Sequence, residues 1–140
     1  GRPFTIVDDD GSAILFASTA ARPNLAPGAT LDDQTTSGPI SSRIDNYLNR
    51  AAFESSGIAF GTLGRNTVIG PIQRRLDLNL SKVTPIGGGR SVELRVEAYN
   101  VTNTPSFRNP NSDLSSGAFG QITRTLGGPR VLQLAAKLRF

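Results

Sequence analysis

The sequence contains no cysteine and no histidine. These absences exclude a thiol nucleophile, a disulfide, a Ser-His-Asp triad and a zinc site of the usual kind. Catalysis would have to rely on Asp, Glu, Lys or Tyr, and acidic residues such as Asp77, Glu93 and Glu97 lie where ion pairs on strand faces explain them. We therefore expect that the chain is not an enzyme, and we expect no cofactor and no metal site.

Methionine, tryptophan and long apolar runs are also missing. No run of about 18 apolar residues exists, so a membrane helix is excluded, whereas strands of a membrane barrel leave no such run because their apolar residues alternate. With 37% hydrophobic residues, 6% aromatic residues, 15 Gly and 9 Pro, the composition is rich in turns and poor in core-forming residues. Because the chain has no Met and starts at Gly1, we expect it to be either processed or cut from a longer protein, and a fragment is the simpler interpretation.

Positive charge is concentrated in the second half of the chain. Residues 1–70 hold five Arg and seven acidic residues, whereas residues 71–140 hold ten Lys or Arg and four acidic residues. A basic half can bind nucleic acid, but aromatic residues interleaved with the arginines are missing, and the arginines lie on the polar faces of predicted strands. We therefore expect no nucleic-acid partner.

The last ten residues, 131–140, alternate between apolar and polar side chains. The apolar members are Leu132, Leu134, Ala136, Leu138 and Phe140. A period of two predicts a strand with one apolar and one polar face. Tilted in a membrane, such a strand spans about 25 Å, the height of the apolar band on an outer-membrane barrel. A soluble strand would instead bury its apolar face on a core, and the pattern alone does not decide between the two.

Two further alternating segments, 75–82 and 90–98, predict a hairpin joined through 84–89, which contains Pro and three Gly. Their polar residues are expected to form cross-strand pairs, with Glu93, Arg95 and Glu97 opposite Arg75 and Asp77. The alternation breaks at Tyr99, where we expect a bulge or the end of regular structure. The apolar face of this hairpin is formed by Leu76, Leu78, Leu80, Val92, Leu94, Val96 and Ala98.

Long stretches rich in Gly, Pro, Asn and Ser predict loops over 103–125 and over most of 8–71. A short turn at one end of the strands and long loops at the other is typical of outer-membrane barrels. Residues 1–7 predict the end of an upstream strand, and 12–18 either a short strand or loop packing. Between them, DDDGS predicts a turn, because the remaining ligands of a calcium loop are missing.

The loop region also contains a helical pattern over 44–54. Ile44, Tyr47, Leu48, Ala51 and Ala52 recur at helical spacing, and Ser42 precedes them as a candidate N-cap. We predict one short amphipathic helix here. Packing on the surrounding loop is favoured over binding a partner, since short apolar stripes usually pack within their own chain.

Several blocks of the sequence, in one order, resemble the carboxyl-terminal end of TonB-dependent outer-membrane receptors of the large type that carry a carboxypeptidase-regulatory-like domain at the amino terminus. The blocks are NRAAF (49–53), GTLGRNTVIGP (61–71), LDLNLSK (76–82), LRVEAYNVTNTPSFRNPN (94–111), LSSGAFGQIT (114–123) and PRVLQLAAKLRF (129–140). Relatives usually carry more aromatic residues after position 71 and at Leu76, which weakens any complete aromatic girdle here.

The resemblance implies a plugged barrel that takes up scarce nutrients with energy from the inner-membrane TonB complex. The chain would then be all-β, with antiparallel strands that form the carboxyl-terminal segment of a transmembrane β-barrel. Residues 1–71 would supply the end of a strand and a long outer loop with the helix, and residues 72–140 would supply the last three strands. The turn 84–89 would be periplasmic and 103–125 an outer loop.

The resemblance also implies roles for the strand residues and for partners. The apolar residues of 132–140 would form the signal read by the outer-membrane assembly machinery, and the apolar hairpin residues would face lipid. Further partners would be the remainder of the barrel and its plug, and the TonB complex through an amino-terminal part outside this sequence. A contribution of the outer loops to ligand binding stays open. The alternative is a soluble, secreted β-rich binding or adhesion module, in which the apolar strand faces would pack in a core.

Overall fold

The computed structural model describes residues 1–9, 21–57 and 59–140. The chain divides into two units, which we call the core unit (Gly1–Ile72 and Phe107–Thr125) and the sheet unit (Gln73–Ser106 and Leu126–Phe140). Among the described residues all extended pairings between named strands are antiparallel and no α-helix is present, so the fold is all-β, as the sequence predicts. No helix in the described ranges has the length and apolar character needed to cross a membrane.

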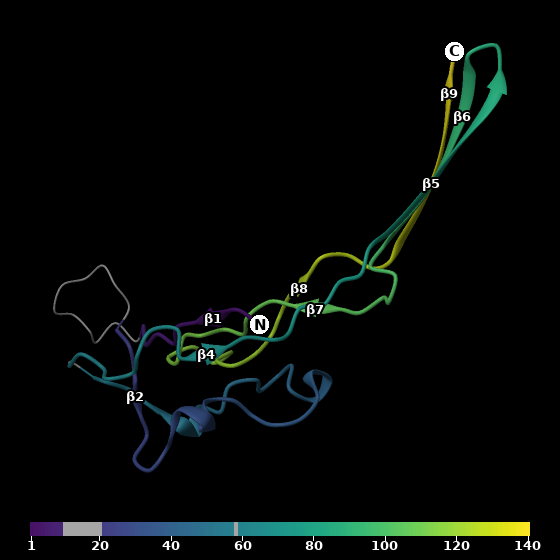
Figure 1. Cartoon of the computed structure of the whole chain (residues 1–140). Helices are drawn as coiled ribbons and strands as arrows, with labels where there is room; N and C mark the ends of the chain where they lie inside the picture. The colour runs from purple at the N-terminus through teal and green to yellow at the C-terminus, as the bar shows by residue number, and fades with distance from the viewer. Residues whose placement is uncertain (10–20, 58) are drawn as a thin grey trace. The chain divides into compact units, whose positions relative to one another are not determined.

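The sheet unit is built from three long strands, β5 (Leu78–Gly87), β6 (Arg90–Tyr99) and β9 (Val131–Arg139). They form one antiparallel sheet in the order β5-β6-β9 (Figure 1). The three alternating segments of the sequence are therefore the three strands of this sheet, because a period of two is the pattern of a strand with two different faces.

The connection between β5 and β6 is shorter than the predicted segment 84–89. β5 continues through Thr84 and Pro85, which pair with Val92 and Ser91, and the register shifts between Pro85 and Gly87. Proline is tolerated here because β5 is an edge strand of this sheet and the register shift removes the need for its missing N–H. The turn itself is formed by Gly88 and Gly89, whose φ angles of 61° and 75° favour glycine.

The end of β6 lies where the alternation breaks. Tyr99 is the last residue of the strand, and Asn100 follows with a φ of 51°. The Asp77 carboxylate accepts a hydrogen bond of 2.8 Å from the Asn100 N–H, and the Leu76 carbonyl accepts one of 2.9 Å from the Val101 N–H. These bonds satisfy the backbone where the sheet pairing stops.

The core unit contains short elements only. β1 (Pro3–Phe4) pairs with β4 (Val68–Ile69), and β2 (Asn24–Leu25) pairs with β3 (Phe53–Glu54). Three 3-10 turns, η1 (Leu31–Gln34), η2 (Ile40–Ser42) and η3 (Arg50–Ala52), lie between them. The division between the units falls within the pair of β7 (Ser106–Phe107) and β8 (Thr125–Leu126).

Side chains from distant parts of the sequence form a hydrophobic core in the core unit. Phe53 and Phe119 meet edge to face with ring centroids 5.6 Å apart. Such burial is the main stabilising term for a unit with so little regular structure. The buried apolar residues are Ile6, Tyr47, Leu48, Ala52, Phe53, Leu63, Val68, Leu114, Phe119 and Ile122. The long segments predicted as loops are thus largely irregular in backbone but packed in their side chains.

The predicted helix over 44–54 is wrong. Only η3 is helical there, and it is a single 3-10 turn with the Asn49 side chain accepting from the Ala51 N–H. Other backbone groups of the segment bond to distant partners: the Tyr47 N–H donates to the Gly120 carbonyl and the Asn49 N–H to the Gln34 carbonyl. These tertiary bonds replace the bonds of a helix, while Tyr47, Leu48 and Ala52 still point into the core.

At the amino terminus, β1 covers only two residues of the segment 1–7 predicted as a strand end. The predictions for 12–18, and for most of the turn after Asp8, lie outside the described residues.

Candidate functional site

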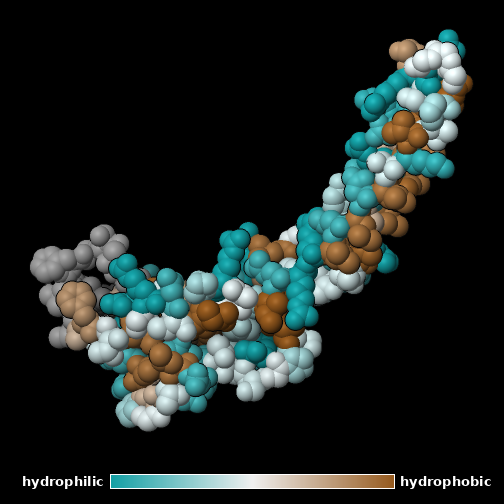
Figure 2. Space-filling model, in the orientation of Figure 1, coloured by the Kyte–Doolittle hydropathy of each residue, from teal (hydrophilic) through white to brown (hydrophobic). Residues whose placement is uncertain are grey.

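The sheet has one apolar face, and the register shows which residues share it. Leu78, Ala98 and Leu132 lie side by side in one row, and Leu80, Val96 and Leu134 in the next. Many of these side chains are exposed, with Leu80 at 72% and Leu134 at 80%. Figure 2 shows apolar residues along one side of the sheet unit and hydrophilic residues along the other. A soluble sheet would cover such a face, so the face requires an apolar partner.

Two more rows extend this face toward the turn. Lys82 lies beside Leu94 and Ala136, and Thr84 lies beside Val92 and Leu138. The lysine is thus on the apolar face in the middle of β5, so its long side chain must extend along the sheet to place its ammonium group at a polar interface.

The register places six of the seven residues predicted to face lipid, namely Leu78, Leu80, Val92, Leu94, Val96 and Ala98, on this face. Leu76 precedes the first residue of β5 and is 47% exposed. Of the five residues predicted to form the assembly signal, Leu132, Leu134, Ala136 and Leu138 lie on β9, and Phe140 follows the end of the strand and is 92% exposed. The sheet therefore places ten of these twelve residues on one surface, and Leu76 and Phe140 lie outside its strands.

The opposite face carries a continuous polar network that spans β6 and both neighbouring strands. Glu93 accepts from Arg139 on β9 at 2.7 Å and from Arg95 at 2.9 Å. Arg95 also lies 3.6 Å from Glu97, which in turn accepts from the Tyr99 hydroxyl at 2.9 Å. At its far end, the Asn79 amide of β5 donates to Glu97 at 3.3 Å. Glu93 is only 8% exposed. The two arginines compensate for burying its negative charge.

The predicted partners of this network differ from the observed ones. Arg75 pairs with Asp77, two residues away, at 2.8 Å instead of with a residue of β6. The reason is the register, which sets Asn79 opposite Glu97 and Val83 opposite Glu93, so that no basic residue of β5 faces the β6 glutamates. The cross-strand cation comes from β9 instead, as Arg139.

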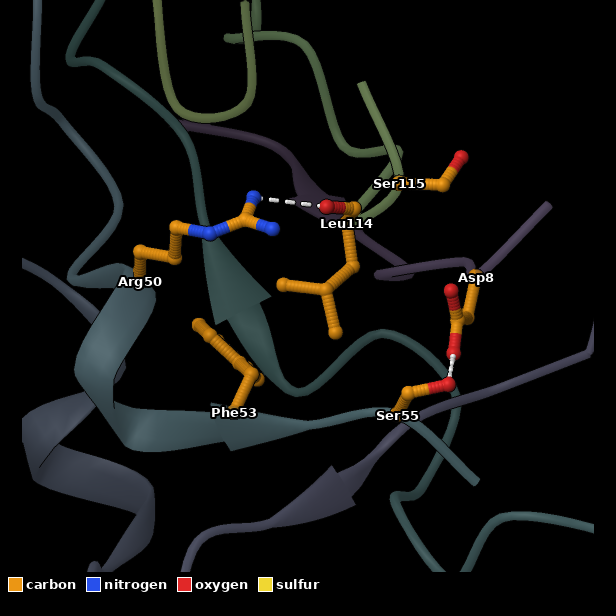
Figure 3. Close-up of a pocket in the computed structure, with 6 residues that line it drawn as sticks. All are labelled: Asp8, Arg50, Phe53, Ser55, Leu114 and Ser115. Carbon is orange, nitrogen blue, oxygen red and sulfur yellow. Dashed lines mark hydrogen bonds between the residues drawn. The ribbon is translucent and has the colours of Figure 1, made fainter. Parts of the chain in front are cut away.

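The core unit contains a pocket of about 260 Å³. Its lining comes from β3 and η3, from the segment near Asp8 and from residues 114 and 115, as Figure 3 shows. The six residues that line it are Asp8, Arg50, Phe53, Ser55, Leu114 and Ser115.

Two groups of opposite charge lie on opposite sides of this pocket (Figure 3). The Arg50 guanidinium donates to the Leu114 carbonyl at 2.6 Å and lies 5.8 Å from the Phe119 ring centroid. Asp8 is 3% exposed, and its carboxylate accepts from the Ser55 hydroxyl at 2.5 Å. Within the described part of the chain, neither Asp8 nor Arg50 forms an ion pair.

Asp113 holds the pocket wall formed by residues 114 and 115. Its carboxylate accepts from the Ser115 hydroxyl at 2.7 Å and from the N–H groups of Ser115 and Asp9. The Ser115 hydroxyl is the main reason that the pKa of Asp113 is lowered from its ordinary value; partial burial acts in the opposite direction, and the backbone donors add to the lowering. The ionised carboxylate thereby ties residue 115 to the segment that carries Asp8.

Sequence reasoning did not identify this pocket. Asp8 was part of a predicted turn, and Arg50 lay in the predicted helix. Their approach depends on tertiary contacts such as the bond of 2.8 Å from the Leu114 N–H to the Val7 carbonyl, and no local pattern signals it. In the described ranges no group of three or more acidic residues is placed to hold a metal ion.

A model of the family described as an outer membrane beta barrel domain matches residues 1–133. The chain belongs to this family. Neither the comparison with curated proteins nor the comparison with solved structures gave a match.

Membership in the outer membrane beta barrel family assigns the chain to an outer membrane and explains the polarity of the sheet unit. Strands of such barrels alternate between apolar residues that point outward and polar residues that point inward. The apolar rows of β5, β6 and β9 and the polar network of Glu93 and Arg95 follow this alternation. Three strands do not close a barrel, so a closed wall requires additional strands.

Proposed function

We propose that this chain is the carboxyl-terminal wall segment of a TonB-dependent receptor that takes up a nutrient across the bacterial outer membrane. The chain belongs to the outer membrane beta barrel family, and the blocks of its sequence that resemble the receptors support the finer assignment. In this proposal the three strands form part of the wall, and the remaining strands and the plug lie outside the 140 residues.

The polarity of the three-stranded sheet is the observation that carries the proposal. Apolar rows such as Leu80, Val96 and Leu134 cover one face, and an ion-pair network covers the other. A wall between lipid and a polar lumen needs this distribution, because lipid cannot satisfy charged groups and a lumen filled by a plug can.

The edges of the sheet supply the second argument. β6 is paired on both sides, whereas β5 and β9 are each paired on one side only within the described residues. Unpaired edges in a membrane leave backbone groups without partners, so both strands require neighbours. In the proposed barrel the outer edge of β9 pairs with the first strand, and its apolar residues serve as the signal for the assembly machinery.

The turn at Gly88 and Gly89 is then periplasmic, and residues 103–125 and most of 8–71 are outer loops. This orientation follows the general rule that outer-membrane barrels have short periplasmic turns and long outer loops. Contact with the TonB complex is proposed through the plug-bearing part of the receptor, not through these residues.

A soluble, secreted binding module is the second candidate, and the hydrophobic core around Phe53 and Phe119 favours it. That core, however, belongs to the core unit alone, and the sheet has no comparable cover for its apolar face among the described residues. A monomeric chain that stays folded in buffer without detergent, with one cooperative unfolding transition, would support this candidate and contradict the receptor.

Genetic removal tests the receptor function itself. Cells that lack the gene should fail to grow on one nutrient of a panel supplied at limiting concentration, and cells with an inactive TonB complex should show the same defect. Restoring the gene should restore growth. Normal growth of the deletion strain on every nutrient, or a defect that does not depend on the TonB complex, contradicts the proposal.

A further inference from the structure

The pocket between Asp8 and Arg50 has features that its own contacts do not explain. Asp8 is almost fully buried, yet within the described residues its carboxylate accepts a hydrogen bond only from the Ser55 hydroxyl and forms no ion pair with a cation. Burying a carboxylate without a cation is costly, and proteins normally balance such a charge. The nearest explanation is a positively charged group supplied from outside the chain.

On the opposite side of the pocket, the Arg50 cation has no carboxylate partner among the described residues. The guanidinium of Arg50 has five N–H groups that can donate hydrogen bonds. One of them donates to the Leu114 carbonyl. Arginine is suited to bind a carboxylate through two parallel hydrogen bonds. No carboxylate of the described chain takes that position.

The lining between the two charges is partly apolar. In Figure 3 the Leu114 side chain lies between Arg50 and Asp8, and Phe53 lies on the Arg50 side. A ligand with opposite charges at its two ends and a small apolar body would satisfy all of these groups. The volume of about 260 Å³ is below the usual range for drug-sized ligands, which limits the ligand to the size of an amino acid.

We propose that this pocket binds a small zwitterion of amino-acid size, with its ammonium group on Asp8 and Ser55 and its carboxylate on Arg50. The proposal deepens the proposed function, on which it rests for its place on the outer side of a receptor, but the binding itself does not depend on transport. Asp113 acts as a positioning residue, because it holds Ser115 and the neighbouring wall residue Leu114 near Arg50.

Four probes of similar size separate the contributions of the two charges. The intact chain in detergent micelles is titrated with 6-aminohexanoate, which carries its two charges at opposite ends, with hexanoate, which lacks the ammonium group, with hexylamine, which lacks the carboxylate, and with glucose. Binding is measured by calorimetry, and the site is located by chemical shifts of Leu114 and Phe53. We expect 6-aminohexanoate to bind at least about tenfold more tightly than either single-charge probe, since a lost charge-assisted hydrogen bond costs about that factor.

Charge variants then assign the contacts. Asp8→Asn should weaken the binding of 6-aminohexanoate while leaving hexanoate binding nearly unchanged, and Arg50→Gln should weaken 6-aminohexanoate binding while leaving hexylamine binding nearly unchanged. Asp9→Asn and Arg65→Gln are matched controls, because neither side chain lines the pocket. Both should bind 6-aminohexanoate like the unaltered chain. The methyl signals of the buried residue Val68 report whether each variant remains folded.

Three results would overturn the proposal: equal binding of 6-aminohexanoate and its single-charge analogues, preference for glucose, or no effect of the two pocket variants in a folded chain. A failure here is distinguishable from failure of the receptor function. Loss of the binding result leaves the TonB-dependent growth defect intact, whereas loss of the growth defect leaves a zwitterion site in the purified chain.

Discussion

The two units of this chain place the same kinds of side chain in opposite environments. All of the fully packed apolar residues belong to the core unit, whereas the residues of the sheet unit that are buried are the polar pair Glu93 and Asn100. Leucine illustrates the difference: Leu63 in the core unit is 2% exposed, and Leu134 in the sheet unit is 80% exposed. The core unit is organised like a water-soluble globule, and the sheet unit like a wall that faces lipid.

The difference shows that hydrophobic content alone does not indicate how a segment is solvated. In the core unit, apolar residues do not alternate with polar ones as they do in the sheet, and they converge only through tertiary contacts. In the sheet unit they alternate strictly, and the alternation itself separates lipid-facing from polar side chains. Variants that act on one unit but not on the other therefore test the comparison.

The largest effect is expected from truncation in the core unit. Leu63→Ala should lower the free energy of unfolding by about 2–5 kcal/mol, because it removes a buried side chain and leaves a cavity. The matched change Leu134→Ala, at an exposed leucine of β9, should cost clearly less. Urea titration of the intact chain in micelles, followed by the methyl signals of Val68, measures the first. Equal effects of the two variants would contradict the distinction between the units.

A charge on the apolar face should have the next largest effect. Leu134→Arg is expected to destabilise the barrel in liposomes by about 2–4 kcal/mol, because the middle of a strand lies deep in the lipid. Gln133→Arg is the control on the opposite face, where the new cation lies opposite Glu97. It should be nearly neutral. Unfolding titrations in liposomes compare the two, and a reversed order would place lipid on the polar face.

Removing the central charge of the polar network should have a smaller effect. Glu93→Gln removes the acceptor of both Arg139 and Arg95, so the unfolding midpoint should fall. Raising the salt concentration should reduce the difference from the unaltered chain, since salt screens charges at an aqueous face. Glu54→Gln, at an exposed residue of β3, is the control and should leave the midpoint unchanged. An unchanged unfolding midpoint in the Glu93 variant would contradict a stabilising role of the polar network.

The smallest effect concerns acid. Asp113 has a pKa in the folded chain below that of the unfolded chain, so the ionised carboxylate contributes stability above the unfolded pKa of about 4. This contribution is lost as the pH falls from that value through the lower, folded pKa. Asp113→Asn should therefore flatten the acid limb of the stability curve of the core unit. An unchanged acid limb in the Asp113 variant would contradict its role in holding Ser115.

The sheet was predictable because the alternation of apolar and polar residues within each strand is visible in its own sequence. The alternation of 131–140 indicates a strand and its two faces without reference to any other residue, and the end of β6 at Tyr99 coincides with the break in alternation. The start of the turn was not predictable from Thr84 and Pro85, since the register shift that accommodates Pro85 depends on pairing with β6.

The core unit and its pocket were not predictable for the same physical reason. The helical spacing correctly indicated that Tyr47, Leu48 and Ala52 are buried, but it wrongly included the exposed Ala51 and did not indicate the backbone that buries the others. The hydrogen bond from the Tyr47 N–H to the Gly120 carbonyl joins segments far apart in sequence. Asp8, Arg50 and Leu114 meet through contacts of this kind, so their shared pocket leaves no trace in any one segment.

The orientation of the sheet toward lipid is the central claim, and the absence of tryptophan allows a direct measurement. Leu134→Trp and Gln133→Trp place one fluorophore on each face of β9 at adjacent positions. Each variant is made in the full-length barrel protein, with any tryptophan outside the 140 residues replaced by phenylalanine, and is reconstituted in vesicles whose lipids carry brominated acyl chains, which quench tryptophan on contact. If the apolar face contacts lipid, we expect strong quenching at position 134 and little at position 133. Equal quenching at both positions, or stronger quenching at 133, would contradict it.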